Sequence, residues 1–127
     1  MIVLVTGGRD YKDRDHFDKT LRHVWTTHTG CFDTIMHGAC GLDADELFDI
    51  TKITGADRLA QNWATLNAVP CIWVPAAWKR LGRPAGPIRN QAMIDKKPDL
   101  VVAFPGGVGT ADCVRRARKA NIRVIEA

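Results

Sequence analysis

Two short segments combine glycines with residues that favour an anion. The first, TGGRD, spans residues 6–10, and the second, PGGVGT, spans residues 105–110. Glycine tolerates a positive φ and lets a ligand approach the backbone closely, so consecutive N–H groups can converge on one anion. The second segment also opens an expected helix, whose first N–H groups and positive dipole end attract phosphate. We therefore expect phosphate binding by Gly7, Gly8, Gly106, Gly107, Gly109 and Thr110.

A plainer interpretation of each segment is a tight turn between a strand and a helix. Thr110 would then only cap its helix through the side-chain hydroxyl. For either segment alone, the tight turn and anion binding are equally good interpretations. Two such segments at one edge of a sheet favour anion binding instead.

Two arginines are the expected partners of the anion's charge. Arg9 lies between the glycine pair and Asp10, and Arg89 lies in GPIRNQAM, shortly before an expected strand. A planar guanidinium can hold a phosphate or carboxylate through two hydrogen bonds. The alternative is a surface arginine without a ligand, which composition alone favours for Arg89.

Other polar residues are expected near the same crevice. His37 and Gly38 end the second expected strand and would line its flank, and Asp10 would face the sugar or base. A histidine here could bind a base or ribose or act as a general base, but such a residue more often holds its own loop. Cys40 and Cys113 have no histidine predictably beside them, so neither is expected to be a nucleophile.

The composition is typical of one globular domain in the cytoplasm. The chain has 127 residues, of which 46% are hydrophobic and 25% charged. We expect no signal peptide, membrane span or membrane partner. The net charge of +4 favours phosphate-bearing partners without naming one. The cysteines form no C-x-x-C pair, so we expect reduced thiols, no metal site and no cofactor.

Short apolar runs alternate with amphipathic segments along the chain. Strands are expected at residues 2–5, 32–36, 69–75, 100–104 and 122–125, and helices at residues 13–28, 56–67, 88–94 and 109–120. This alternation predicts an α/β fold, a Rossmann-like three-layer sandwich with a five-stranded parallel sheet in the order 3-2-1-4-5. Ligands of such sheets bind where the connections reverse direction, here between the first and fourth strands. Both glycine-rich segments leave these strands.

Two connections need separate interpretation. Residues 42–54 form an apparent insertion, with a possible short helix that packs Leu47. Its acidic cluster, which begins at Asp43, lacks the glycine and terminal glutamate of a calcium loop, so we expect a solvated face. Residues 76–87 are rich in breakers and basic residues and should form a loop, in which Trp78 covers the crevice or anchors the loop.

Four motifs together resemble the YspA-like branch of the SLOG superfamily. They are GGRDY, HGACG with GADRLAQNWA, AGPIRNQAM, and DLVVAFPGGVGTADCVRRAR, and they occur in the family's order between Val3 and Val124. The superfamily unites the DprA DNA-processing proteins with the Lonely Guy enzymes, which release cytokinin bases from nucleoside monophosphates. The resemblance implies one Rossmann-like domain over residues 1–127 that binds a nucleotide or an ADP-ribose-like metabolite, as a sensor or carrier.

The Lonely Guy resemblance implies an alternative activity, a phosphoribohydrolase that cleaves the N-glycosidic bond of a nucleoside 5′-monophosphate. Arg89 matches the arginine of the family's R-K-x-x-M element and would orient the substrate, but Cys113 occupies the glutamate position of P-G-G-x-G-T-x-x-E. Asp112 is then the candidate catalytic carboxylate, because a thiol stabilises an oxocarbenium-like state poorly. Alternatively, Asp112 only matches the dipole of its helix.

The resemblance also raises two kinds of macromolecular partner. DprA suggests single-stranded DNA, but the basic run over residues 115–119 has no aromatic neighbour in sequence on which bases could stack, so we expect a solvated face. Lonely Guy relatives suggest a homodimer through the helix at residues 56–67. Trp63 in that helix is equally compatible with an internal position.

Overall fold

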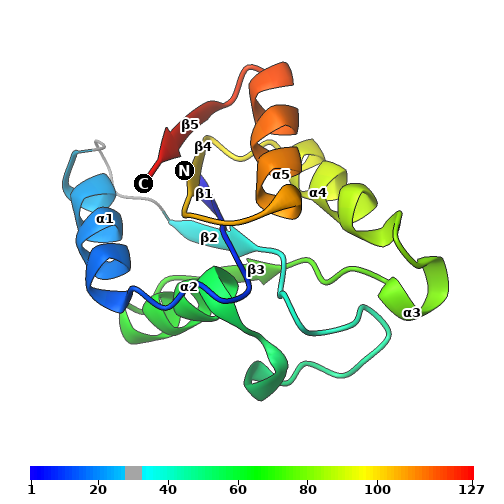
Figure 1. Ribbon diagram of the computed structural model, residues 1–127. Helices are drawn as coiled ribbons and strands as arrows, with labels where there is room; N and C mark the ends of the chain where they lie inside the picture. Colours follow the sequence, from blue (N-terminus) through cyan, green and yellow to red (C-terminus); the bar gives the residue numbers. More distant parts are fainter. Residues whose placement is uncertain (28–32) are drawn as a thin grey trace.

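The computed structural model describes residues 1–27 and 33–127, and its centre is a parallel sheet between two layers of helices (Figure 1). The strands pair in the order β3-β2-β1-β4-β5, which confirms the predicted fold class and strand order. Their bounds are β1 Ile2–Thr6, β2 Thr34–His37, β3 Cys71–Trp73, β4 Leu100–Ala103 and β5 Arg123–Glu126.

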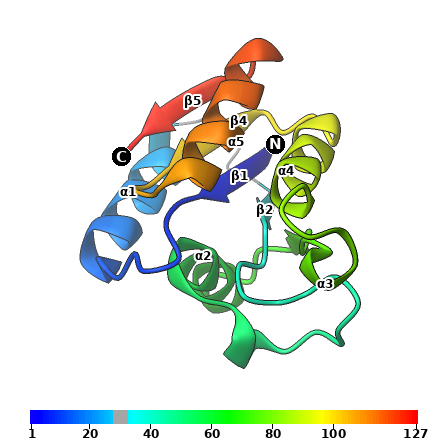
Figure 2. The ribbon, with the colours of Figure 1, turned by 45° about the vertical axis from the view of Figure 1, so that its right-hand side comes forward.

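The helices cover the two faces of the sheet in pairs. Their bounds are α1 Arg14–Thr27, α2 Gly55–Leu66, α3 Trp78–Leu81, α4 Ala85–Asp95 and α5 Val108–Lys119, with a short 3-10 helix η1 at Ile50–Lys52. Helices α1 and α2 lie on one face, and α4 and α5 lie side by side on the other (Figures 1 and 2). Among the described helices, none is long and apolar enough to cross a membrane.

Strand β1 shows why the sheet is covered on both faces. Val3 and Val5 are completely buried in the cluster that contains Phe17 of α1, while Leu4 is completely buried in the cluster that contains Met93 of α4. Successive side chains of a strand point to opposite faces, so an unbroken apolar run needs a helix layer on each. Burial of this apolar surface is the main driving force of the fold.

Several expected bounds differ from those observed. Helix α4 begins at Ala85 rather than at residue 88, and the expected loop over residues 76–87 contains α3. The breakers misled the interpretation because Pro87 falls in the first turn of α4, where a proline needs no N–H partner. The expected helix end near His28 and strand start at Phe32 lie outside the described residues.

The insertion is tied to α3, and its acidic cluster is solvated only in part, since the Asp45 side chain is 55% exposed while Asp43 is buried. Asp43 is only 4% exposed, and its carboxylate accepts hydrogen bonds from the amides of Asp45, at 3.1 Å, and Lys79, at 3.0 Å. Leu47, which was expected to pack, is 91% exposed. Trp78 anchors its segment, because its ring lies against Gly86 of α4, where an added Cβ would come within 2.8 Å of the ring.

Candidate functional site

The two glycine-rich loops touch at the carboxyl edge of the sheet. The amide of Gly8 donates to the carbonyl of Pro105 at 2.9 Å, and the amide of Phe104 donates to the carbonyl of Thr6 at 2.9 Å. A Cβ at Gly106 would lie 2.7 Å from the Gly8 nitrogen. The β1–α1 and β4–α5 loops therefore meet at the point where the connections reverse direction, as their positions after β1 and β4 predict.

Three glycines of these loops, Gly7, Gly8 and Gly106, allow a close approach of neighbouring segments, whereas a Cβ at Gly107 or Gly109 would meet nothing within 4 Å. None of the five named glycines has φ in the left-handed region. A Cβ at Gly7 would lie 2.6 Å from the Cβ of Ala56, and a Cβ at Gly106 would meet the Thr110 hydroxyl. The need for glycine at Gly7, Gly8 and Gly106 therefore comes from the packing of β1, α2 and the β4–α5 loop.

The β4–α5 loop and the first turn of α5 carry a run of consecutive amides without a partner among the described residues. The Gly8 amide is already bonded to Pro105, whereas the amides of residues 106–109 make no hydrogen bond to another described residue. Gly107 is the N-cap of α5 and offers no side-chain cap, and Thr110 does not supply one either. These N–H groups can donate hydrogen bonds to an anion, because the first four N–H groups of a helix have no partner inside it.

Arg89 and Arg9 differ in how they are held. Arg89 is half-buried, with Nη1 donating to the carbonyl of Gly38 and Nε donating to Oδ1 of Asn90 at 3.0 Å, which leaves Nη2 for a ligand. A Cβ at Gly38 would lie 2.8 Å from Cζ of Arg89, so a larger residue there would displace the guanidinium from this position. Arg9 and Asp10 are exposed, and neither side chain is bonded to another described residue.

His37 supports its own loop. It is completely buried, Nε2 is 2.7 Å from Oε1 of Gln61, and Nδ1 accepts from the Ala39 amide at 3.0 Å. Because an amide can only donate, Nδ1 is the acceptor nitrogen and Nε2 carries the proton toward Gln61. Both ring nitrogens are engaged, so His37 positions the β2–α2 loop and has none left for a base or ribose.

Asp57 is a candidate that the sequence analysis missed. It lies in the first turn of α2, is 7% exposed, and accepts a hydrogen bond from the Cys40 amide at 3.0 Å. Burial raises the pKa of Asp57, while the charge of Arg89 and the amide hydrogen bonds lower it in part. The helical spacing of Asp57 with Ala60 and Ala64 could have identified it from the sequence, because the three residues share the buried face of α2.

Asp112 joins α5 to α4 instead of facing an open crevice. Asp112 is 6% exposed, and its carboxylate accepts hydrogen bonds from Nδ2 of Asn90 at 3.0 Å and from Nε of Arg116 at 2.9 Å and also pairs with Arg115. Burial alone would raise the pKa of Asp112, but the hydrogen bonds from Arg116 and Asn90 outweigh it and lower the pKa. Burial raises the pKa of neighbouring Cys113 to about 11, so its thiol stays protonated.

The Asp112 contacts predict a pH-dependent contribution to stability. A lowered folded-state pKa adds stability above the ordinary pKa of 3.8, and this stability is lost as the pH falls through the folded-state value. We expect Asp112→Asn to unfold more easily than the wild type at pH 7, by about 1–3 kcal/mol, and the gap to narrow below about pH 4. Urea unfolding of both proteins at pH 7 and below about pH 4 measures the difference in their free energies of unfolding. A gap of the same size at both would contradict the interpretation.

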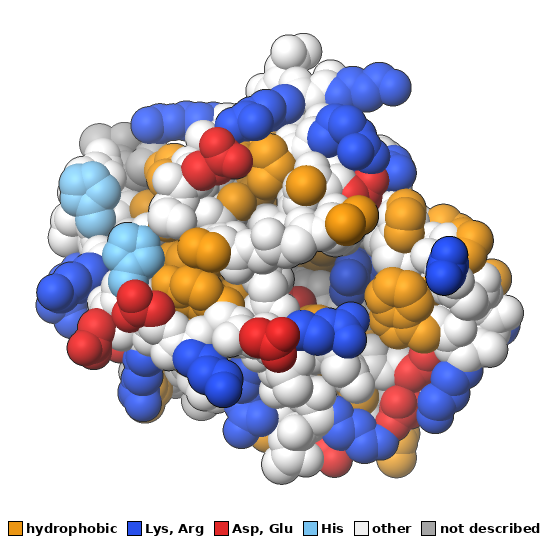
Figure 3. All heavy atoms as spheres, in the orientation of Figure 1, with side chains coloured by type: hydrophobic (Ala, Val, Ile, Leu, Met, Phe, Trp, Pro, Cys, Tyr) orange, Lys and Arg blue, Asp and Glu red, His pale blue; other side chains and the backbone are white. Residues whose placement is uncertain are grey.

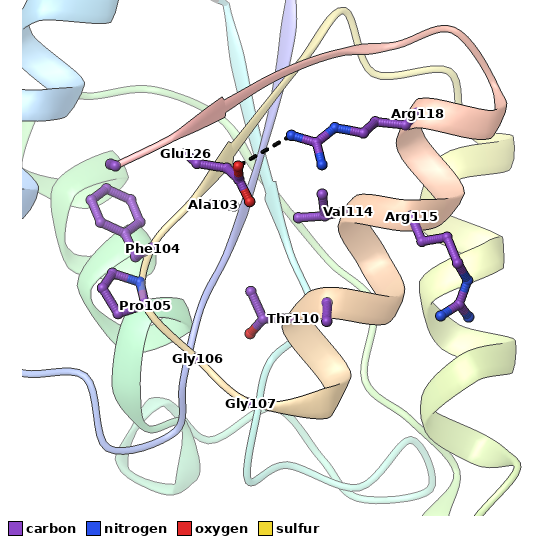
Figure 4. A pocket seen from close by; sticks show the side chains of 12 residues that line it. Ala103, Phe104, Pro105, Gly106, Gly107, Thr110, Val114, Arg115, Arg118 and Glu126 are labelled. Atoms are coloured by element: carbon purple, nitrogen blue, oxygen red, sulfur yellow. Dashed lines mark hydrogen bonds and ion pairs between the residues drawn. The ribbon is translucent and has the colours of Figure 1, made fainter.

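A cavity of about 550 Å³ adjoins the β4–α5 loop on the side of β5 (Figure 4). The sequence analysis missed it, because its walls come from the end of β5, one face of α5 and the glycine loop. The lining residues are Ala103, Phe104, Pro105, Gly106, Gly107, Thr110, Ala111, Val114, Arg115, Arg118, Glu126 and Ala127. Its volume falls in the range of small-molecule sites.

The surface on the side seen in Figure 1 is hollowed near its middle, where basic, acidic and apolar side chains meet (Figure 3). Within residues 1–27 and 33–127, no three His, Cys, Asp or Glu side chains come together as metal ligands. The site therefore offers backbone amides, guanidinium groups and single carboxylates as its polar groups.

Comparison with known proteins gives one informative relative. No protein-family model matches the chain, and no solved structure matches it. The Gene 61 protein of Mycobacterium phage D29 is 33% identical over 132 residues, an alignment that covers 97% of this chain and 93% of that protein. Similarity at this level over nearly the full length of both proteins places them in one family. The chain belongs to the family of the Gene 61 protein of Mycobacterium phage D29.

Proposed function

We propose that the protein binds a nucleotide or a nucleotide-derived phosphorylated ligand, as a sensor or carrier. The observation that supports this most is the position of the unpaired amides of residues 106–109, next to a cavity of about 550 Å³. Two arginines line the cavity, and both are paired, Arg115 with Asp112 and Arg118 with Glu126, so the loop amides rather than a net charge favour an anion here. A phosphate on these amides would gain charge-assisted hydrogen bonds.

The two arginines named from the sequence would complete the anion site from the other side of the loop. Arg89 keeps Nη2 available while Gly38 and Asn90 hold the rest of its guanidinium. Arg9 lies on the β1–α1 loop, which contacts the β4–α5 loop through Gly8 and Pro105. The guanidinium of Arg89, already held by Gly38 and Asn90, loses less conformational entropy on binding than a free one.

Calorimetry against a panel of ligands tests this proposal. The panel contains the four common ribonucleoside 5′-monophosphates, their diphosphates, ADP-ribose and the matching nucleosides without phosphate. We expect binding of at least one phosphorylated member, and at least about tenfold weaker binding of its unphosphorylated nucleoside, because the charge-assisted hydrogen bonds are lost. Absence of binding across the panel at millimolar concentration, or equal affinity for the nucleoside, would overturn the proposal.

One observation favours a second function, hydrolysis of the N-glycosidic bond of a nucleoside monophosphate. The carboxylate of Asp112 is already bonded to Asn90, Arg115 and Arg116, which leaves it poorly placed for catalysis. Asp57 is a different candidate, a buried carboxyl group near the Arg89 charge. The loop at Gly38 and Cys40 binds both groups, through the Gly38 carbonyl to Arg89 and through the Cys40 amide to Asp57. A buried carboxyl group close to an arginine suits acid–base chemistry at a glycosidic bond. Chromatographic detection of free base tests this activity, and release that persists in Asp57→Asn would exclude Asp57 from it.

The basic run on α5 gives little support to nucleic-acid binding. Arg115 and Arg116 pair with Asp112, and Arg118 pairs with Glu126 at 3.2 Å. These pairs neutralise much of the charge that a phosphate backbone would need to meet. The small-molecule proposal therefore takes precedence over single-stranded DNA.

A further inference from the structure

The cavity between α5 and β5 has a distinct arrangement of walls. Ala103, Phe104 and Val114 are at most 6% exposed and give it an apolar base. The side chains of Arg118 and Glu126 point toward one another across one end, and Thr110 and the glycine loop lie at the other (Figure 4). A ligand here would meet apolar surface along its length, polar groups at one end and free amides at the opposite end.

The α4 side of the glycine loop offers few groups for a base or sugar. His37 is completely buried with both ring nitrogens engaged, and Asn90 is bonded to Arg89, to Asp112 and to the Gly109 carbonyl. A polar group that already has its partners in the fold gains little from a ligand. The part of the ligand beyond its phosphate is therefore better matched by the α5–β5 side.

We infer that this cavity takes the nucleoside part of the ligand, with the carboxylate of Glu126 accepting hydrogen bonds from the ribose hydroxyls; the inference rests on the proposed function. Apolar walls suit the faces of a base. A carboxylate only accepts hydrogen bonds, so it selects hydroxyl donors. The Glu126 and Arg118 side chains are 64% and 57% exposed, and an exposed ion pair is weak enough to share its carboxylate with a ligand.

A substitution at Glu126 tests the ribose contact. We expect the wild type to bind a ribonucleoside 5′-monophosphate at least about tenfold more tightly than its 2′-deoxy analogue, as for loss of a hydrogen bond to a charged group. Glu126→Gln should reduce this preference to less than about threefold, because a neutral amide is a weaker acceptor. Because the Glu126 side chain is exposed, we expect Glu126→Gln to fold like the wild type. A changed preference between the ribonucleotide and its 2′-deoxy analogue therefore reports on the ribose contact.

A substitution on α5 tests occupation of the cavity. Ala111 is exposed and lines the cavity, so the ring in Ala111→Phe would fill that space. We expect at least about tenfold weaker nucleotide binding, while binding of pyrophosphate, which needs only the amides and cations, changes less than about threefold. Ala120→Phe is the matched control, because Ala120 is an exposed residue just after the same helix and does not line the cavity.

The outcomes separate the two proposals. Wild-type protein that binds none of the nucleotides overturns the proposed function and this inference together. Wild-type protein that binds a nucleotide, with Ala111→Phe binding it equally well and Glu126→Gln keeping any ribose preference, overturns the inference alone. Selective loss in both variants, with Ala120→Phe unchanged, supports the cavity as the nucleoside site.

Discussion

Gly106→Ala is expected to weaken nucleotide binding at least about tenfold and to lower the free energy of unfolding by about 1–3 kcal/mol. The added Cβ would lie 2.7 Å from the Gly8 nitrogen and would also meet the Thr110 hydroxyl. Neither neighbour moves freely, because the Gly8 amide is bonded to the Pro105 carbonyl and Thr110 lies in α5. The two loops would therefore separate. Urea unfolding and calorimetry measure the two effects.

Gly109→Ala is the matched control for stability. Gly109 lies in the first turn of α5, and a Cβ there would meet nothing within 4 Å. Because alanine has the higher helix propensity, we expect this variant to be more stable than the wild type by about 0.5–1 kcal/mol. Equal stability of Gly106→Ala and Gly109→Ala would contradict the close contact between the loops.

Arg89→Lys is expected to weaken binding of the phosphorylated ligand by about 10–100-fold, as for loss of one or two charge-assisted hydrogen bonds. The Arg89 guanidinium contacts the Gly38 carbonyl and the Asn90 side chain and still has Nη2 free. A lysine ammonium is a single point of charge on a flexible stem, so it cannot hold these two partners and a phosphate in the same geometry.

The control for Arg89→Lys is Arg22→Lys, an exposed position on α1, on the opposite face of the sheet from α4. It changes the same chemical group without touching the loops. Calorimetry with the tightest-binding nucleotide of the panel gives both affinities. If Arg89→Lys and Arg22→Lys bind this nucleotide alike, Arg89 does not contact the phosphate.

The topology of the sheet was predictable from the sequence for a physical reason. Alternating apolar runs and amphipathic segments predict parallel strands, and right-handed crossovers leave few possible strand orders. Once β1 and β4 are neighbours, the loops that leave them must share an edge, so the meeting of Gly8 with Pro105 follows from the pattern.

Roles that depend on contacts between distant segments were not predictable. The engagement of His37 needs Gln61, 24 residues later in α2, and the burial of Asp43 needs the Lys79 amide, 36 residues later. Spacing marks Asp57 as part of a buried helix face, yet only the fold brings it near Arg89. The sequence shows which polar side chains are present but does not show which distant residues they contact.

The cavity illustrates the same limit at a larger scale. From the sequence, Glu126 is recognisable only as a polar residue at the end of an expected strand. Its position opposite Arg118 depends on the pairing of β5 with β4 and on the packing of α5 against them. No local sequence pattern predicts the cavity between these elements, because its volume depends on how side chains from several distant segments pack.

The most direct test of phosphate binding by the β4–α5 loop is a titration of ¹⁵N-labelled protein with each of the four ribonucleoside 5′-monophosphates, followed by NMR. We expect the amide signals of residues 106–109 to shift saturably with the ligand that calorimetry identifies, because these N–H groups have no other partner among the described residues. Signals of residues 46–49 in the insertion should stay in place. Saturable shifts elsewhere, with residues 106–109 unaffected, would contradict phosphate binding at this loop.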